Sequence, residues 1–345
     1  MKGSMRAAVA QRSGEPLVIE RRPIPAPGPG EVLVKIHASG ICHTDLHAMD
    51  GDWPIKPALP FIPGHEGTGV VAELGFGVSQ LQVGDAVGIA WLHDACGHCE
   101  YCITGWETLC ERQHNSGYGV DGTFAEYTIA NAAYVVRLPH DCDFFALAPI
   151  LCAGVTSYKG IRETEVRAGE WIAISGIGGL GHLAIQYAHA MGLRVAAIDV
   201  SDAKLELARS LGAEIVVNAN DGRALEDIRL GTGGGAHGVL VTAVSPAAFA
   251  QALGMVRRKG TVCLVGLPPG DFPTPIFDVV LKRITLRGSI VGNRQDLSEA
   301  MAMAANGKVR AMTEPYSLDQ INAALDRLRR GEVEGRAVLD MTLLA

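Results

Sequence analysis

The sequence lacks the features that would indicate a membrane or a nucleic acid as partner. It contains no uninterrupted apolar run of about 18 residues, the length that a membrane-spanning helix needs. It also contains no basic tract, and its 30 lysines and arginines are outnumbered by 37 aspartates and glutamates, which gives a net charge of −7. We therefore expect neither a membrane nor a nucleic acid as partner.

The amino terminus lacks a secretory signal, which would carry a charged region followed by an apolar one. We therefore expect the eight cysteines to be reduced and the protein to be cytoplasmic. Charged residues make up 19% and hydrophobic residues 48% of the chain, which is typical of a globular protein. At 345 residues the chain exceeds the size that one core usually serves, so we expect two domains.

Half of the cysteines fall in one short segment with the spacing C-x2-C-x2-C-x7-C. Four thiolates can surround one metal as a tetrahedron, and zinc is the usual occupant of such a closed, structural cage. An iron–sulfur cluster is the rival, but the x7 gap does not match the characteristic spacings of those clusters. The segment is expected to be ordered by the metal. The predicted structural zinc ligands are Cys96, Cys99, Cys102 and Cys110.

The first part of the chain, from residue 5 to about 150, is predicted to be β-rich. Short apolar or alternating runs are separated there by clusters of proline and glycine. We assign residues 1–153 and 291–345 to a first domain and residues 154–290 to a second. The expected strands of the first part are Met5–Val9, Val32–Ala38, Gly69–Leu74, Ala86–Trp91, Thr123–Ile129 and Ala133–Arg137.

From about Ala153 apolar strands alternate with helical patterns, which predicts a parallel, doubly wound sheet. Ser201 is the expected N-cap of the second helix. The stretch from about Gly292 is expected to return to the first domain with a helix over Asp319–Arg330 and a strand over Arg336–Met341. The other expected elements are strands Trp171–Ser175, Arg194–Asp199, Ile215–Val217, Val239–Ala243, Val262–Val265 and Ile284–Gly288, and helices Leu180–Met191 and Ala203–Leu211.

A glycine-rich turn follows the strand Trp171–Ser175 and matches the dinucleotide-binding pattern G-x-G-x-x-G. Its glycines allow a pyrophosphate to approach the N-terminus of the next helix. Asp199 would accept hydrogen bonds from ribose hydroxyls and repel a 2′-phosphate, which favours NAD over NADP. A plain turn with a solvated aspartate is the alternative, and Lys204 is either a ribose contact or a solvated lysine. The turn is Gly176-Ile177-Gly178-Gly179-Leu180-Gly181.

Three further elements carry side chains that bind metals or transfer protons. Two sulfurs and one imidazole form a zinc site with an open fourth position, as expected of catalytic zinc. Alone, a histidine is more often an ordinary core or surface residue, and a cysteine a small buried hydrophobe. Their joint occurrence with a dinucleotide motif favours a catalytic metal. The elements are Cys42-His43-Thr44-Asp45 with His47, Gly64-His65-Glu66, and Cys152 in Leu151-Cys152-Ala153-Gly154.

Over essentially its full length the chain resembles the zinc-dependent alcohol dehydrogenases of the medium-chain dehydrogenase/reductase superfamily, in particular the microbial, yeast-type ethanol dehydrogenases. The resemblance implies a GroES-like catalytic domain, a Rossmann cofactor domain, NAD, two zinc ions per subunit and a homotetramer. It rests on Gly64-His65-Glu66-Gly67-x-Gly69 continuing to Gly75 and Val78, on Cys42-His43-Thr44-Asp45-Leu46-His47-Ala48 with Gly51-Asp52-Trp53, and on Leu151-Cys152-Ala153-Gly154-Val155-Thr156.

The resemblance implies the catalytic roles as well. Cys42, His65 and Cys152 would bind the catalytic zinc, while Glu66 would approach it transiently or stand behind the ligands. Asp45 would hold a ligand in its orientation. The alcohol would bind as a zinc alkoxide and pass a hydride to the nicotinamide.

The proton released from the alcohol needs a relay out of a dry site. The resemblance implies that it passes from the Thr44 hydroxyl through the cofactor ribose to His47, whose ordinary pKa of about 6.5 suits that terminus. Asp50 stands where some relatives carry a second histidine. Because the relay ends at His47, we expect this difference to have little effect on the mechanism, although a carboxylate near that imidazole could alter the pH profile.

Two cationic side chains are implied to lie at the cofactor pyrophosphate. His43 occupies a position where many relatives carry arginine, and a histidine, charged only part of the time, cannot form the guanidinium fork. We therefore hypothesise weaker cofactor binding and faster NADH release than an arginine would give. Arg336 is implied to contact the pyrophosphate, with an ordinary surface arginine as the alternative.

Trp53 and Trp91 resemble the aromatic pair that narrows the alcohol pocket in the microbial branch, although core tryptophans are the alternative. A narrow pocket favours reversible oxidation of small primary alcohols. The rivals are the same chemistry on a polyol, threonine, an aromatic alcohol or a glutathione–formaldehyde adduct, and a non-enzymatic NAD-binding protein. The full set of ligand and relay residues argues against the last. Cys142 and Cys263 receive no role.

Overall fold

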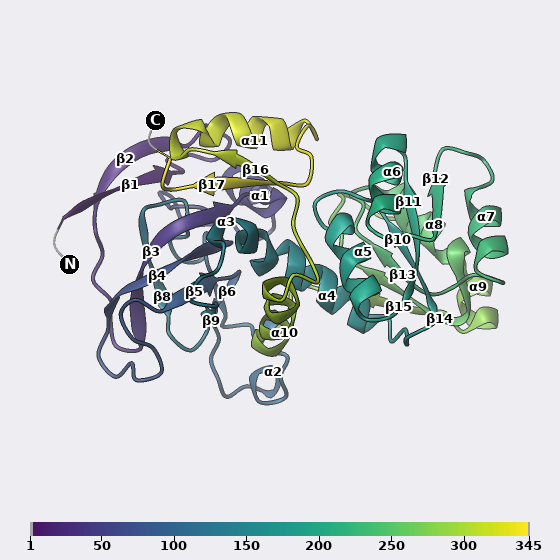
Figure 1. Cartoon of the computed structure of the whole chain (residues 1–345), viewed down its shortest axis with the longest axis horizontal. Helices are drawn as coiled ribbons and strands as arrows, with labels where there is room; N and C mark the ends of the chain where they lie inside the picture. Colours follow the sequence, from purple (N-terminus) through teal and green to yellow (C-terminus); the bar gives the residue numbers. More distant parts are fainter. Residues whose placement is uncertain (1–2, 344–345) are drawn as a thin grey trace. The chain divides into compact units, whose positions relative to one another are not determined.

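The computed structural model describes residues 3–343, and the chain forms two compact units (Figure 1). The first unit runs up to Cys152 and also takes in Gly292–Ala305 and the chain from Ala311 onward. The second unit contains Ala153–Val291 and Asn306–Arg310. All the predicted metal ligands therefore belong to the first unit, and the glycine-rich turn belongs to the second.

The first unit is built on a seven-stranded sheet in the order β16-β17-β3-β4-β5-β9, with β8 paired to β3 outside that order. The β16–β17 pair is parallel and the other pairs are antiparallel. In Figure 1 the yellow C-terminal strands lie beside the purple strand β3 of the same unit. The strands are β3 (Glu31–Gly40), β4 (Gly67–Leu74), β5 (Ala86–Ile89), β8 (Tyr127–Asn131), β9 (Val136–Arg137), β16 (Thr313–Tyr316) and β17 (Arg336–Asp340).

Two short antiparallel ladders and several helices surround this sheet. One ladder joins β1 (Ser4–Val9) to β2 (Val18–Pro23), and the other joins β6 (Leu92–Asp94) to β7 (His114–Asn115). The helices are α1 (His43–Asp50), α2 (Glu100–Ile103), α3 (Phe144–Leu147), α10 (Arg294–Ala305) and α11 (Ile321–Arg329), with 3-10 turns η1 (Glu107–Leu109), η2 (Ala148–Leu151) and η3 (Leu318–Gln320).

Helix α1 positions several of the candidate catalytic side chains. It begins after Cys42, which has extended backbone, and ends at Asp50 because Gly51 adopts a left-handed φ of 64° and its N–H donates to the His47 carbonyl. Leu46 and Met49 are buried in a core cluster that they share with β1 and α11. One buried face thus fixes the helix, while its first turn stays at the metal-binding cluster.

The second unit is a six-stranded parallel sheet in the order β12-β11-β10-β13-β14-β15. This order reverses direction at β10, as in a doubly wound fold. The strands are β10 (Trp171–Ser175), β11 (Arg194–Asp199), β12 (Ile215–Asn218), β13 (Ala236–Val241), β14 (Val256–Leu264) and β15 (Thr285–Gly288); the helices are α4 (Ala153–Glu163), α5 (Gly181–Ala190), α6 (Asp202–Ser210), α7 (Ala224–Gly231), α8 (Pro246–Met255) and α9 (Ile276–Lys282).

The predicted fold class, a β-rich domain with a doubly wound parallel sheet, is confirmed. Ser201 does occupy the N-cap position of α6, but its side chain makes no capping hydrogen bond. No single helix within residues 3–343 has the length and apolar composition to cross a membrane, and the broken pair Phe144–Leu151 with Ala153–Glu163 meets that test by length and composition only.

Candidate metal centres and cofactor site

Four buried side chains form the first candidate metal centre. Cys42 precedes α1, His65 and Glu66 precede β4, and Cys152 follows η2. One ligand atom from each lies within 4.8 Å of the others. The sulfurs of Cys42 and Cys152 are 3.9 Å apart. Two thiolates at about 2.3 Å from one tetrahedral zinc would be separated by about 3.8 Å, so the spacing of the sulfurs fits that metal.

The buried carboxylate of Asp45 connects the residues of this cluster by hydrogen bonds. Its carboxylate accepts hydrogen bonds from the backbone N–H of Cys42 at 2.8 Å and of Gly64 at 3.2 Å, and it lies 3.0 Å from Nδ1 of His65. The imidazole proton therefore belongs on Nδ1, which leaves the lone pair of Nε2 for a ligand. Nε2 is buried and has no hydrogen-bond partner within the described residues. An orphaned lone pair beside two sulfurs fits a cation.

The ionisation of the cluster depends on how closely its members pack. A hydrogen bond from Cys152 lowers the pKa of the Cys42 thiol, despite its burial. Burial disfavours a charged His65, but the neighbouring Asp45 outweighs it and raises the pKa of the imidazole. A bound metal would take the place of that proton.

Glu66, a member of the cluster, forms a buried ion pair with Arg336. Arg336 is only 4% exposed and donates from its guanidinium to Oε1 of Glu66. Burial raises the pKa of Glu66 to about 7, although Arg336 opposes the shift. Oε2 of Glu66 has no hydrogen-bond partner among the described residues, and one oxygen of this carboxylate lies within reach of the cluster. Arg336 is thus no surface residue, and its contact with a pyrophosphate stays a prediction.

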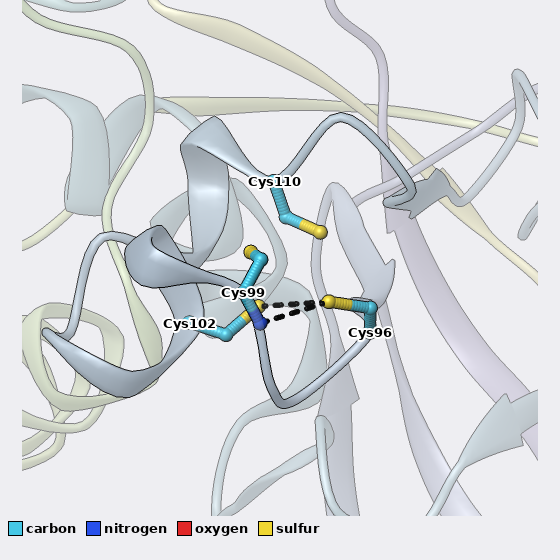
Figure 2. Close-up of side chains that lie close together, drawn as sticks. All are labelled: Cys96, Cys99, Cys102 and Cys110. Carbon is cyan, nitrogen blue, oxygen red and sulfur yellow. Dashed lines mark hydrogen bonds between the residues drawn. The ribbon is translucent and has the colours of Figure 1, made fainter.

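The second candidate metal centre consists of the four spaced cysteines (Figure 2). Their sulfurs lie within 4.8 Å of one another, and those of Cys96 and Cys102 are 3.9 Å apart. The backbone N–H groups of His98 and Cys99 donate to the Cys96 sulfur and help to lower its pKa to about 5. A closed cage of four sulfurs offers no open position, so this centre is suited to a structural metal.

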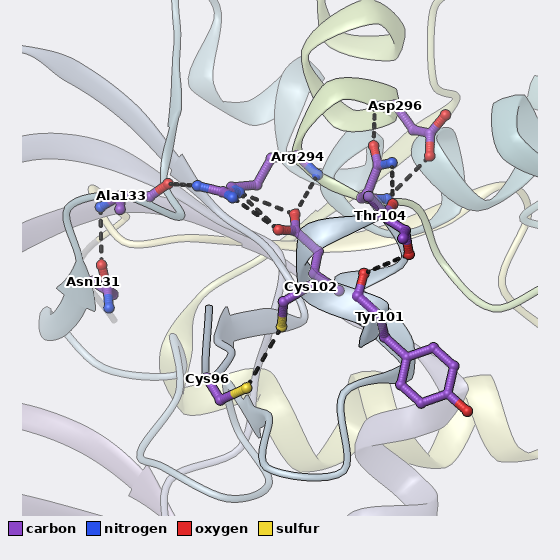
Figure 3. A network of polar contacts seen from close by, with 11 residues as sticks. Cys96, Tyr101, Cys102, Thr104, Asn131, Ala133, Arg294 and Asp296 are labelled. Atoms are coloured by element: carbon purple, nitrogen blue, oxygen red, sulfur yellow. Dashed lines mark hydrogen bonds and ion pairs between the residues drawn. The ribbon is translucent and has the colours of Figure 1, made fainter. Parts of the chain in front are cut away.

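A buried carboxylate attaches the cysteine lobe, defined as residues 96–110, to helix α10 (Figure 3). Glu107 on η1 is 4% exposed and accepts hydrogen bonds from the Arg294 side chain at 2.9–3.1 Å and from its backbone N–H at 3.0 Å. The Arg294 guanidinium also lies 4.5 Å from the ring centre of Tyr134 and donates to the Ala133 carbonyl. The sequence analysis missed this contact, because 187 residues separate its partners.

The two predicted relay residues lie on α1. Thr44 Oγ1 is 3.7 Å from the Cys42 sulfur. His47 Nδ1 is 2.9 Å from the carboxylate of Asp52. The side chain that contacts His47 is therefore Asp52, while Asp50 forms an ion pair with Arg329 at 2.9 Å, and the effect of Asp50 on the pH profile stays a prediction. The left-handed turn at Gly51 ends the helix, and the carboxylate that contacts His47 lies just beyond it.

Trp53 and Trp91 are neighbours, with ring centres 6.2 Å apart in an edge-on arrangement. Trp91 also meets the His65 ring edge-on at 5.3 Å, and Trp53 stacks on the His47 ring at 5.4 Å. Tyr118 lies 5.6 Å from each indole. The sequence analysis missed Tyr118, since it stands in a glycine-rich turn without a recognisable motif.

The glycine-rich turn joins β10 to α5 in the second unit. Gly176 has a φ of +97°, and a Cβ there would collide with Ala243. At Gly178, by contrast, a Cβ would meet no atom within 4 Å, so the protein's own packing does not require this glycine. The empty space fits a group that binds from outside. Within the described residues the N–H groups of Gly178, Gly179, Leu180 and Gly181 donate no hydrogen bond, as expected of an anion-binding helix terminus.

Asp199 ends β11, beside this turn. Its carboxylate accepts hydrogen bonds from the backbone N–H of Ile177 at 2.6 Å and of Ser201 at 3.0 Å, which fixes its orientation at the sheet edge. Lys204 lies exposed on α6, and its role stays a prediction. Desolvation by surrounding atoms lowers the pKa of His43. Cys263 is fully buried in β14, and the pKa of its thiol is raised to about 12 by burial, which makes it unreactive.

Comparisons with known proteins agree with this geometry. Residues 28–140 match the family of alcohol dehydrogenase GroES-like domains, and residues 179–306 match the zinc-binding dehydrogenases. An alcohol dehydrogenase of Moraxella sp. (strain TAE123) is 57% identical over 339 residues, which cover 98% of this chain and 100% of the relative.

Two solved structures extend the likeness to the fold. The alcohol dehydrogenase of the hyperthermophilic archaeon Aeropyrum pernix has a TM-score of 0.89 and 35% identity, with 97% of this chain and 99% of that chain covered. The acetophenone reductase of Geotrichum candidum, in complex with NAD, has a TM-score of 0.85 and 29% identity, with coverage of 98% and 97%. The chain belongs to the zinc-dependent alcohol dehydrogenases of the medium-chain dehydrogenase/reductase superfamily.

Proposed function

We propose that the protein is a zinc- and NAD-dependent alcohol dehydrogenase that reversibly oxidises small primary alcohols to aldehydes. The observation that carries this proposal is the buried cluster of Cys42, His65 and Cys152, where an unpartnered imidazole nitrogen lies beside two sulfurs. Three such ligands leave the fourth position of a tetrahedral metal open for a substrate. The membership of the family gives this cluster its expected chemistry.

Two zinc ions per subunit are proposed, one for each candidate centre. Zinc held by Cys42, His65 and Cys152 would supply a Lewis acid that makes a hydroxyl group more acidic. Asp45 fixes the tautomer and the orientation of His65. Glu66, paired with Arg336, provides a carboxylate within reach of the ligands. The cysteine lobe would hold the second, structural ion.

NAD is the proposed cofactor, and it would accept the hydride. The free N–H groups and the open space at Gly178 are suited to a pyrophosphate, and the Asp199 carboxylate disfavours a 2′-phosphate. The relative that is in complex with NAD supports this choice. His43, Lys204 and Arg336 are proposed as further cofactor contacts.

The chain's own side chains would move the proton. Thr44 is proposed to take it at Oγ1, and His47 to deliver it to solvent at Nε2. Support for the second role comes from Asp52, because its carboxylate lies against Nδ1 and leaves Nε2 free. His47 is also only partly buried, as a proton exit to water requires.

The homotetramer is proposed partly from an exposed apolar surface on the second unit. Helix α9 and the edge strand β15 carry large apolar side chains that are exposed to solvent in a single chain. Exposed apolar surfaces of this kind mark interfaces. The cytoplasm is proposed as the location, because both cages need reduced thiols. The exposed side chains are Ile276, Phe277, Val280 and Leu281 on α9, Leu286 on β15, and Ile290 just after β15.

A zinc count per subunit, measured together with NADH formation across a series of primary alcohols, tests the proposal. We expect two zinc ions and activity that peaks at short chains. Replacing Trp91 with alanine should shift the preference toward longer alcohols, since the indole lies against His65. One zinc ion and no turnover on any alcohol would reject the proposal. Turnover confined to aromatic alcohols, polyols or glutathione–formaldehyde adducts would support the alternative substrates.

A further inference from the structure

Tyr118 completes a closed triangle of aromatic rings at the candidate metal centre. Its ring lies 5.6 Å from Trp53 and 5.6 Å from Trp91, and the two indoles are 6.2 Å apart. Trp91 connects the triangle to His65, and Trp53 connects it to His47. The three rings therefore lie between a metal-binding side chain and the proposed proton exit.

The backbone under Trp53 has few attachments. Across residues 3–343, the segment Asp52–Pro60 is tied to the rest of the fold by two hydrogen bonds: Asp52 with His47, and the Ile55 carbonyl with the Tyr118 hydroxyl. Three of its nine residues are prolines, which have no N–H to donate. The backbone under the Trp53 indole is thus held by these two hydrogen bonds, in addition to the ring contacts of the indole itself.

Tyr118, in contrast, stands on a firmly held turn. The N–H groups of residues 118–120 all donate to the Asn115 carbonyl, at 2.8–3.2 Å, and the N–H of Ser116 donates to the Trp91 carbonyl at 2.9 Å. The turn also packs tightly on the backbone beside His65: a Cβ at Gly117 would lie 2.6 Å from the Gly64 nitrogen. The Tyr118 hydroxyl therefore ties a weakly held segment to backbone that adjoins the metal ligands.

We propose that Tyr118 is a positioning residue for substrate specificity: its hydroxyl holds the Trp53 segment in place over the candidate metal centre, while its ring supports the wall that Trp53 and Trp91 form. This inference rests on the proposed oxidation of alcohols. Burial, with the negative charge of nearby Asp52, raises the pKa of Tyr118, so the phenol keeps its proton and remains a donor. Tyr118→Phe would keep the aromatic ring that supports the wall and lose the hydrogen bond that ties the Trp53 segment. Tyr118→Leu would lose both.

The tie is tested without substrate by ¹⁹F NMR of protein labelled with 5-fluorotryptophan. The chain has four tryptophans, and Trp106 and Trp171, outside the triangle, serve as internal references. We expect Tyr118→Phe to shift and broaden the Trp53 resonance and to leave those of Trp106 and Trp171 unchanged. Tyr101→Phe removes a hydroxyl from another partly exposed ring and is the matched control. An unchanged Trp53 resonance in Tyr118→Phe would overturn the tie.

The pocket role is tested by kcat/KM for ethanol and for 1-hexanol in the zinc-loaded enzyme. Loss of one hydrogen bond should raise KM for ethanol about fivefold in Tyr118→Phe, with kcat nearly unchanged. In Tyr118→Leu the ethanol-to-hexanol ratio should fall further, because the ring that supports the wall is gone as well. Equal losses for both alcohols, or an unchanged ratio in both variants, would overturn the proposal. No turnover by the unaltered enzyme would refute the alcohol dehydrogenase function, and the NMR result would still decide on the tie.

Discussion

A single carboxylate organises the buried metal centre at the residue scale. Asp45 accepts hydrogen bonds from the backbone of Cys42 and Gly64 and contacts Nδ1 of His65. This one side chain thus fixes the backbone at Cys42, the backbone just before His65, and the tautomer of His65. Because such preorganisation is present in the chain itself, little rearrangement is needed when a metal enters.

Replacing His43 with arginine should slow the release of NADH. The lowered pKa of His43 leaves its imidazole mostly neutral at pH 7, whereas a guanidinium always carries charge and donates two parallel hydrogen bonds to a phosphate. At an exposed position we expect a gain of about 1 kcal/mol, or roughly a fivefold slower dissociation. Stopped-flow fluorescence of NADH measures this rate. His140→Arg, on an exposed loop, is the control, and an unchanged or faster rate in His43→Arg would contradict the hypothesis.

The partner of His47 shows what spacing in the sequence does not reveal. Asp50 and Asp52 are both close to His47 in the chain, and the sequence analysis considered only Asp50. The choice depends on where α1 ends and on the left-handed turn at Gly51, after which Asp52 contacts the imidazole. Asp50 is taken by Arg329 from α11, a partner 279 residues away that no local pattern could identify.

At the scale of elements, the strands around the glycine-rich turn were predictable because they are short runs with apolar interiors and have glycines close by. Trp171–Ser175 and Arg194–Asp199 have the same bounds in the structure as in the sequence analysis. Helix α1 was missed, since two histidines and two aspartates in eight residues weaken its amphipathic pattern. Its stability comes from Leu46 and Met49 in a core shared with distant elements.

The attachment of the cysteine lobe to α10 leads to a prediction at this scale. Glu107→Gln should accelerate loss of zinc from the lobe to a chelator and lower the unfolding free energy. Removing one charge of a buried pair costs about 3–5 kcal/mol, and because the Arg294 side chain is half exposed we expect about 1–3 kcal/mol here. Zinc release to a colorimetric chelator and thermal unfolding measure the two effects.

The control for this variant is Glu206→Gln, which breaks an exposed ion pair with Arg209 on α6. Such surface pairs contribute about 0–1 kcal/mol, so zinc release and unfolding should change little. If both variants released zinc at the rate of the unaltered protein, the Glu107–Arg294 contact would have no part in retaining the metal.

At the scale of the whole molecule, the exposed apolar surface of the second unit predicts assembly. Phe277, 80% exposed on α9, should be buried between copies of the chain. We therefore expect Phe277→Asp to convert the proposed tetramer to smaller species in analytical ultracentrifugation, because a buried unpaired charge is costly. Phe76→Asp is the control, since Phe76 is 87% exposed on a turn of the first unit. A tetramer that persisted in Phe277→Asp would place the interface elsewhere.

The course of the chain through the first unit affects how the protein is made on the ribosome. The six cysteines and one histidine that are proposed to bind metal all precede Ala153, so they are translated before the second unit. Strand β17 pairs with β3, however, and supplies Arg336, which neutralises Glu66 beside the metal centre. Strand β17, with Arg336 at its start, comes from the last part of the chain. Although domains generally fold in the order of their synthesis, the amino-terminal unit here can be completed only after the unit that follows it has been translated.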